Sequence, residues 1–195
     1  MDRQPYYEAV KSNLETNILF HSLALEACLG GIYDYLKSQN QLEAGEPARE
    51  EWTLAGLVHD IDYAGDTKDK HPNKTREVLA KYHLEISNTV DHLVKAHADQ
   101  TGIVPKNKAE WSIRCADSLT GLITAVALIY PSKKLAEVKV SSVLKRFLKE
   151  PKFAAGTRRD EVILCQDADK INIPLEKFIE ICLTSMQGIS NQINL

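Results

Sequence analysis

The chain has 195 residues, of which 44% are hydrophobic and 26% are charged, and its formal net charge is −3. This length and composition are typical of a single soluble domain with a substantial core. The small negative charge excludes the kind of basic field that attracts nucleic acid, so no nucleic-acid partner is expected.

Membrane association is not expected from the sequence. The N-terminal residues lack the apolar core of a signal peptide, and the longest mostly apolar stretch, residues 119–130, is far shorter than the ~20 residues that span a bilayer. The four cysteines are scattered among apolar neighbours without a C-x-x-C pair, which favours buried, reduced thiols. We therefore expect a cytoplasmic protein.

The clearest helix is predicted over residues 14–36, where apolar residues recur at three- and four-residue steps along one stripe. His21 lies in the middle of that stripe, so its side chain is expected to point into the core. Residues 40–47 contain asparagine, glycine and proline, which predict a loop.

A short buried helix is predicted from about residue 50 to residue 60, and it ends at the doublet His59-Asp60. Two adjacent ionisable residues at the end of a buried segment are costly without a partner. A metal ion suits both, because imidazole and carboxylate are ligands of first-row metals. The polar segment 62–69 that follows is expected to be an exposed loop.

Two further helices carry ligand-type residues on their buried faces. The helix predicted over about 85–97 places His97 within its apolar stripe and His92 nearly opposite, toward solvent. The strongly apolar helix predicted over about 109–130 places Asp117 on a polar stripe inside a buried element.

The remaining segments complete an all-α prediction. His71-Pro72 is expected to open the helix that follows the polar loop, since proline is favoured in a first turn. Helices are also predicted near residues 134–149, 157–168 and 174–188, the last behind a candidate cap at Asn172. The predicted fold is one helical bundle, in which residues 1–130 hold the ligand-type side chains and residues 131–195 form C-terminal helices packed on the same domain.

Each ionisable residue has an ordinary structural explanation when it is taken alone. A single core histidine is usually satisfied by a backbone carbonyl, and a single buried aspartate usually caps a helix or forms a salt bridge. Four or five such residues in one core are costly to satisfy separately, whereas one cation satisfies them together.

The order His, His-Asp, Asp on these helices resembles the HD-domain superfamily of metal-dependent phosphohydrolases, and within it the bacterial and archaeal HDIG-type branch. The motifs are His21 in His-Ser-Leu-Ala-Leu-Glu-Ala, His59-Asp60 in Leu-Val-His-Asp-Ile-Asp and Asp117 in Cys-Ala-Asp-Ser-Leu-Thr-Gly. The resemblance covers about residues 18–125 with specific motifs. It departs from His-Asp-Ile-Gly at Asp62, which replaces a glycine but no metal ligand.

The resemblance implies a fold of the HD type and a set of metal ligands, with His59 and Asp60 at the centre of catalysis. The first four ligands would hold one ion. Members with two ions use two further histidines before the last aspartate, and the doublet aspartate then bridges the ions. The implied ligands are His21, His59, Asp60 and Asp117, with His71 and His97 for the second ion. Nitrogen and oxygen donors suit one or two divalent ions of Mn, Fe, Co, Ni or Zn.

The function implied by the resemblance is hydrolysis of a small phosphorylated metabolite or nucleotide by a metal-activated water molecule. A di-iron oxygenase of the same superfamily would use the same six ligands, and a non-catalytic metabolite-sensing domain is a third alternative. Lys68 and Lys70, just after the doublet, are the first candidates for contact with an anionic substrate. Most basic residues between 133 and 159 are expected to form a solvated helix face. The sequence leaves open whether the chain forms homo-oligomers.

Overall fold

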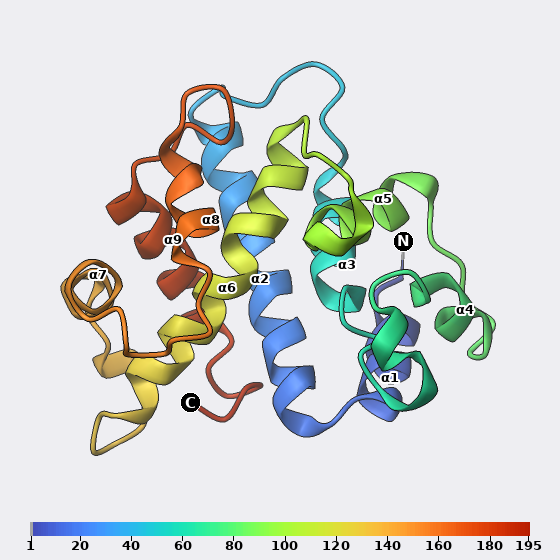
Figure 1. Ribbon diagram of the computed structural model, residues 1–195, viewed down its shortest axis with the longest axis horizontal. Helices are drawn as coiled ribbons and strands as arrows, with labels where there is room; N and C mark the ends of the chain where they lie inside the picture. The colour runs from blue at the N-terminus through green and yellow to red at the C-terminus, as the bar shows by residue number, and fades with distance from the viewer. Residues whose placement is uncertain (1) are drawn as a thin grey trace.

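The computed structural model describes residues 2–195, and within that range all regular secondary structure is helical (Figure 1). The α-helices in chain order are α1 (Gln4–Asn13), α2 (Thr16–Ser38), α3 (Arg49–Val58), α4 (Thr75–Ala80), α5 (Asn88–Ala96), α6 (Lys108–Leu128), α7 (Val140–Lys149), α8 (Arg159–Val162) and α9 (Leu175–Gly188). Short 3₁₀ helices lie between them: η1 (Gly65–Lys70), η2 (Asp99–Thr101), η3 (Leu135–Glu137) and η4 (Ile163–Gln166). The all-α prediction is therefore confirmed.

Helix α2 forms the centre of the core. It packs against α3, α6 and α9, and Figure 1 shows α2 and α6 in the middle of the molecule, with α3 and α5 to one side and α7 to α9 to the other. The predicted stripe of α2 is buried at Leu25, Cys28, Leu29 and Ile32. His21 departs from the prediction, because 23% of its side chain is exposed.

A close approach of two backbones positions the doublet. Helix α3 ends at Val58, and His59 is its C-terminal cap. A Cβ atom at Gly56, one turn earlier, would lie 2.9 Å from the backbone N and Cα of Glu26 on α2. Glycine therefore lets α3 pack directly on α2, which brings His59 close to His21 of that helix.

The segment after the doublet is mostly exposed, as its polarity predicts, but it contains two buried polar residues and the short helix η1. Asp62 is fully buried and Thr67 nearly so. The Asp62 carboxylate accepts hydrogen bonds from His71 Nδ1 at 2.6 Å and from the backbone N–H of Lys74 at 2.7 Å, so its burial is satisfied. The prediction that His71-Pro72 opens a helix is wrong, because the ψ of His71 is 139°, which is not helical, and α4 begins later, at Thr75.

The C-terminal helices are shorter than predicted, except for α9. Residues 134–149 contain η3 and only then α7, and residues 157–168 divide into α8 and η4. Asn172 does not cap α9: its φ of 61° is left-handed, and Pro174 occupies the cap position. Helix α9 packs on α2, and α8 packs on α6.

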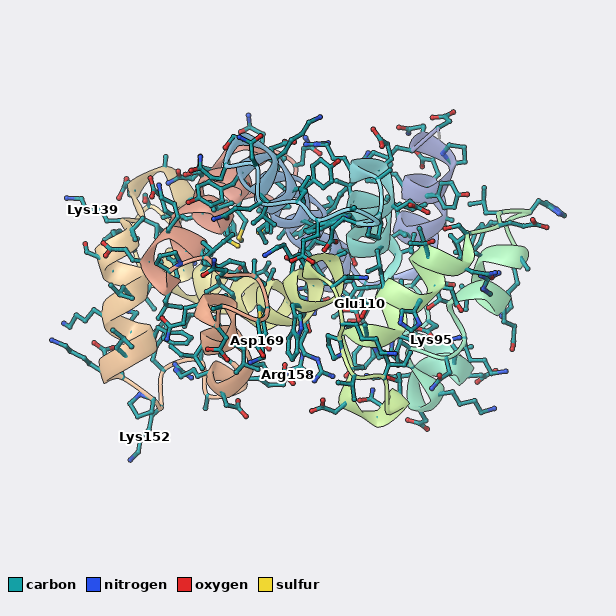
Figure 2. The ribbon with its side chains drawn as sticks, turned by 90° about the horizontal axis from the view of Figure 1, so that it is seen from above. Lys95, Glu110, Lys139, Lys152, Arg158 and Asp169 are labelled. Atoms are coloured by element: carbon teal, nitrogen blue, oxygen red, sulfur yellow. The ribbon has the colours of Figure 1, made fainter. Side chains whose placement is uncertain are left out.

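The basic run is mostly solvated, as predicted, but its three arginines are half-buried: Arg146, Arg158 and Arg159. Lys139 and Lys152 are exposed and project outward at one edge of the molecule (Figure 2). Arg159 instead donates to backbone carbonyls in the last turn of α7 and in the turn that follows it, including those of Phe147 and Phe153. Arg158 lies nearer the middle of the molecule in Figure 2, and it contributes to the site described below.

The four cysteines are buried free thiols, as predicted. Burial raises the pKa of the Cys165 thiol to about 12, so it is protonated at neutral pH. Within residues 2–195, no helix combines the length and the hydrophobicity required to cross a bilayer.

The Gly56 contact generates a stability prediction. We expect Gly56→Ala to lower the free energy of unfolding by about 1–3 kcal/mol, because the new methyl group would overlap the α2 backbone. The matched control is Gly121→Ala in α6, where a Cβ atom meets nothing within 4 Å. It should be neutral or stabilising by up to about 1 kcal/mol, because alanine favours helix. Urea unfolding of both variants measures the difference, and equal stabilities would contradict the packing argument.

Candidate metal centre

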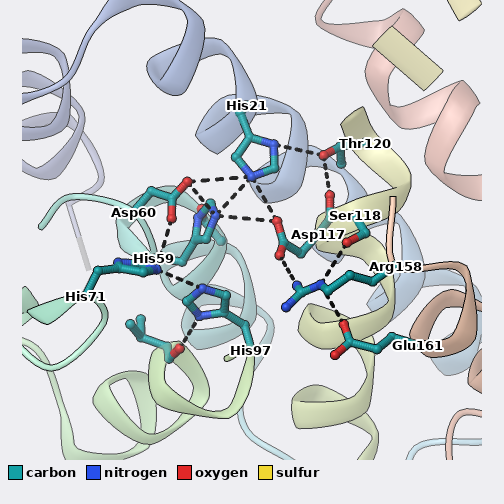
Figure 3. A network of polar contacts seen from close by, with 12 residues as sticks. His21, His59, Asp60, His71, His97, Asp117, Ser118, Thr120, Arg158 and Glu161 are labelled. Carbon is teal, nitrogen blue, oxygen red and sulfur yellow. Dashed lines mark hydrogen bonds and ion pairs between the residues drawn. The ribbon is translucent and has the colours of Figure 1, made fainter. Parts of the chain in front are cut away.

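The structure brings all six predicted ligand residues together in one cluster (Figure 3). They come from separate parts of the chain: α2, the end of α3, the segment between η1 and α4, the end of α5, and the middle of α6. The cluster consists of His21, His59, Asp60, His71, His97 and Asp117.

The cluster divides into two groups of three residues. In each group, one candidate ligand atom from every residue lies within 4.8 Å of the others. The first group is His21, His59 and Asp117, and the second is Asp60, His71 and His97. Each group therefore offers the number of donors that a metal site with open positions uses.

The carboxylate of Asp60 lies between the two groups. Its Oδ2 is 3.2 Å from Nε2 of His59, which belongs to the first group. Its Oδ1 is 3.4 Å from Nε2 of His71, which belongs to the second. One carboxylate thus presents a separate oxygen to each group, as a bridging ligand would.

Helix ends orient two of the histidines. Nδ1 of His59 is 2.8 Å from the carbonyl oxygen of Gly56, and Nδ1 of His97 contacts the carbonyl oxygen of Val94. Each carbonyl is in the last turn of its helix, where carbonyl oxygens have no partner within the helix. A carbonyl can only accept, so Nδ1 carries the proton in both rings.

Side chains orient the other two histidines. Nδ1 of His71 donates to the buried carboxylate of Asp62 at 2.6 Å. Nδ1 of His21 is 3.0 Å from the Thr120 hydroxyl, whose single proton goes to the backbone carbonyl of Asp117 at 2.7 Å, so His21 donates to Thr120. All four Nδ1 atoms therefore face outward with a proton, which is how metal-ligating histidines are held.

The four Nε2 atoms face one another inside the cluster. Nε2 of His21 is 3.2 Å from that of His59, and Nε2 of His71 is 3.1 Å from that of His97. Two bare nitrogen lone pairs repel at this separation, so a proton or a cation must lie between the members of each pair. Neutral imidazoles with carboxylates are the donors that first-row transition metals prefer, so these residues fit such an ion.

Burial and the charges of the neighbouring residues set the protonation of His59 and His97. Burial opposes ionisation of His59, but the negative charges of Asp60 and Asp117 outweigh burial and raise the pKa of His59 to about 9. At pH 7 a cation bound at His59 Nε2 must therefore displace a proton, and its affinity falls as the pH drops below about 9. For His97, burial and the neighbouring His59 lower the pKa to about 4, so this ring is already neutral.

The two carboxylates remain ionised within the cluster. Burial acts to raise the pKa of Asp60 and Asp117, but the surrounding histidines outweigh it and hold both pKa values well below the ordinary range. Their side chains are 13% and 14% exposed, whereas that of His59 is 1% exposed. The cluster is thus closed at His59 and partly open to solvent at the two carboxylates.

Arg158 is the main contributor that the sequence did not single out. It was expected on a solvated face, but its Nη2 lies 2.7 Å from Asp117 Oδ2, and its Nε lies 3.1 Å from the Ser118 hydroxyl and 2.9 Å from Glu161 (Figure 3). No spacing pattern could have linked residues 117 and 158, because only the packing of α8 on α6 brings them together.

The predicted substrate lysines belong to η1, the segment that directly precedes His71. Lys68 Nζ sits 4.7 Å above the ring of Tyr63, and that ring packs edge-on against His71. Lys70 is exposed in η1. Contact of Lys68 and Lys70 with a substrate stays a prediction. His92 is 49% exposed, as predicted, although it also pairs with Glu110.

No family model, curated protein or solved structure matches the chain. The geometry shows groups of histidine and aspartate that could hold a metal ion.

The two groups generate a prediction of metal content. We expect the protein to bind two divalent transition-metal ions and His97→Ala to bind about one, because the second group loses a donor. His92→Ala is the matched control on the same helix; its ring faces solvent, so the variant should keep the wild-type metal content. Elemental analysis after dialysis measures this. A wild-type protein that saturates at one ion, or a His97→Ala variant that keeps two, would contradict the two-group arrangement.

Proposed function

We propose that the protein is a metal-dependent phosphohydrolase of the HD-domain type that acts on a small phosphorylated metabolite or nucleotide. The observation that carries this proposal is the convergence of four Nε2 atoms on the carboxylates of Asp60 and Asp117, with every Nδ1 atom bonded outward. The order His, His-Asp, Asp along the chain, which resembles that superfamily, supports the same class.

The bound metal would supply positive charge against a phosphoryl oxygen and a water molecule acidic enough to lose a proton near neutral pH. The protein's own contribution is to hold the donors. Asp60 and Asp117 are ionised and oriented by their histidine neighbours. The outward bonds of the imidazoles keep their Nε2 lone pairs available.

An anionic substrate requires a positively charged side chain near the cluster. Two ionised carboxylates would repel a phosphate group that approached the open side of the cluster. Arg158 lies beside Asp117 on this side, and 36% of its side chain is exposed. Its planar guanidinium presents several N–H donors, which suits phosphoryl oxygens, so we assign it the role of substrate contact.

A di-iron oxygenase is the second candidate, because the position of Asp60 fits it as well as it fits the hydrolase. Asp60 offers a separate oxygen to each three-residue group, and a pair of irons would use such a carboxylate equally well. Iron content and oxygen consumption separate the two classes, since phosphoester hydrolysis requires neither a change of oxidation state nor dioxygen.

The hydrolase proposal predicts metal-dependent release of phosphate. With Mn, Co or Ni supplied, the protein should release phosphate from a generic phosphoester or a nucleoside phosphate, and chelation should stop the reaction reversibly. Asp60→Ala should lose metal and activity together, because this carboxylate faces both groups. His92→Ala is the control and should remain active.

Three results would contradict this proposal. Asp60→Ala could retain full activity and metal content. The protein could fail on a broad phosphoester panel while it binds iron tightly and consumes oxygen, which would favour the oxygenase. It could also bind a metabolite saturably without turnover, which would favour a sensing domain.

The Arg158 assignment predicts a change in KM. Arg158→Gln should raise KM for a phosphate monoester by about tenfold or more, because a charge-assisted hydrogen bond contributes about 1.5–3 kcal/mol. Arg158→Lys should restore part of the affinity, since it keeps the charge but not the planar donors. Lys152→Gln, from the exposed part of the same basic run, is the control and should leave KM unchanged. An unchanged KM in Arg158→Gln would show that Arg158 positions Asp117 and does not contact the substrate.

A further inference from the structure

A cavity of about 410 Å³ adjoins the metal-ligand cluster and shares His21 with it. This volume lies in the range of small-molecule sites, roughly 300–1,000 Å³. Its apolar walls come from α2, from α6 and from the last segment of the chain: Phe20, Leu128, Ile193 and Leu195. Among the described residues that line it, the polar side chains other than His21 are uncharged amides and a hydroxyl: Asn17, Asn194 and Thr124.

The cavity continues from the cluster along one face of α6. Asp117 faces the metal ligands, and the residues that line the cavity follow it at helical spacing: Gly121, Thr124 and Leu128. His21 Nε2 is 2.9 Å from Asp117 Oδ1, and the exposed part of the same ring contributes to the cavity wall. A molecule with one group at the cluster would therefore extend along α6 into the cavity.

We propose that this cavity binds the organic part of the substrate, and that this part is uncharged and largely apolar. The proposal rests on the proposed function, because the phosphoryl group of the same molecule would lie at the cluster. Apolar walls favour an aromatic or aliphatic group through burial of its surface. A charged or polyhydroxylated group would lose its water there, and among the described residues that line the cavity no acidic or basic side chain other than His21 is present to compensate.

Gly121 supports this assignment. A glycine in the middle of a helix costs about 1 kcal/mol relative to alanine, so α6 would be more stable with a side chain at this position. A Cβ atom there would meet nothing within 4 Å, so no neighbouring group requires glycine. The absence of a side chain keeps the cavity open, and a large side chain at this position would occupy it.

The test compares two phosphonates that cannot be hydrolysed, phenylphosphonate and methylphosphonate, in calorimetric titrations of the Mn-loaded protein. Both carry the same anionic head, so their affinity ratio reports the cavity rather than the metal centre. We expect phenylphosphonate to bind at least about tenfold more tightly, because burial of a phenyl ring in apolar surroundings is worth that much or more. A ratio near one in the wild-type protein would overturn the inference.

Two pairs of variants localise the effect. Gly121→Leu should bring the ratio toward one, whereas Gly188→Leu, at a helical glycine with equally free Cβ space outside the cavity, should keep it. Leu128→Gln should also lower the ratio, and its control is Ile129→Gln. These two residues are adjacent and equally exposed, at 49% and 50%, but only Leu128 lines the cavity. The Leu128 pair decides the result if Gly121→Leu does not fold.

The possible results separate the two proposals. If Gly121→Leu and Leu128→Gln both keep the wild-type ratio of phenylphosphonate to methylphosphonate affinity, the cavity assignment is overturned. A preference that behaves as expected, in a protein that hydrolyses no phosphoester, would support the cavity and overturn only the proposed function. Hydrolysis of a phosphoester, together with equal affinities for the two phosphonates, would support the proposed function and overturn the cavity assignment.

Discussion

Four imidazole rings whose Nε2 atoms face one another cannot stay packed in a protein core without positive charge between them. The outward hydrogen bonds of the Nδ1 atoms impose this constraint, because they commit the proton of each neutral ring to the outside of the cluster. Rotation of any ring would break one of these bonds and leave a buried acceptor without a partner. The cluster is therefore stable with protons or a cation inside, and a cation can serve all of its donors together.

The cluster also connects the site to the fold. Its members come from separate elements, so a bound ion would hold α2, α3, α5 and α6 together, and part of its binding free energy would stabilise the folded state. The close contact at Gly56 brings α3 to α2. The buried carboxylate of Asp62 joins His71 to the backbone at Lys74, so the segment between α3 and α4 is ordered around the second group.

The C-terminal helices do more than cover the core. Arg158 reaches Asp117 from the start of α8, and residues 193–195 form part of the cavity wall next to His21. Residues from both sides of the predicted boundary near residue 130 therefore contribute to the candidate metal centre and the adjoining cavity. Under the proposed function, a substrate would place its anionic group beside Arg158 and its organic group along α6.

The sequence by itself determined the all-α class, the long helices and the residues of the candidate metal centre. The helices and the largely buried placement of His59, His97 and Asp117 depend on local periodicity and on residue types whose burial is costly, and both can be read from neighbouring positions in the chain. His71 joined the predicted ligand set only because the motifs resemble those of the HD-domain superfamily. Only the tertiary structure decided that Asp62 is buried against His71, that Arg158 pairs with Asp117, and that a cavity opens beside His21. The Arg158–Asp117 pair and the cavity depend on contacts between residues far apart in the chain, and such contacts produce no regular residue spacing in the sequence. For Asp62, local polarity predicts exposure, and only the hydrogen bonds of the folded chain make burial favourable.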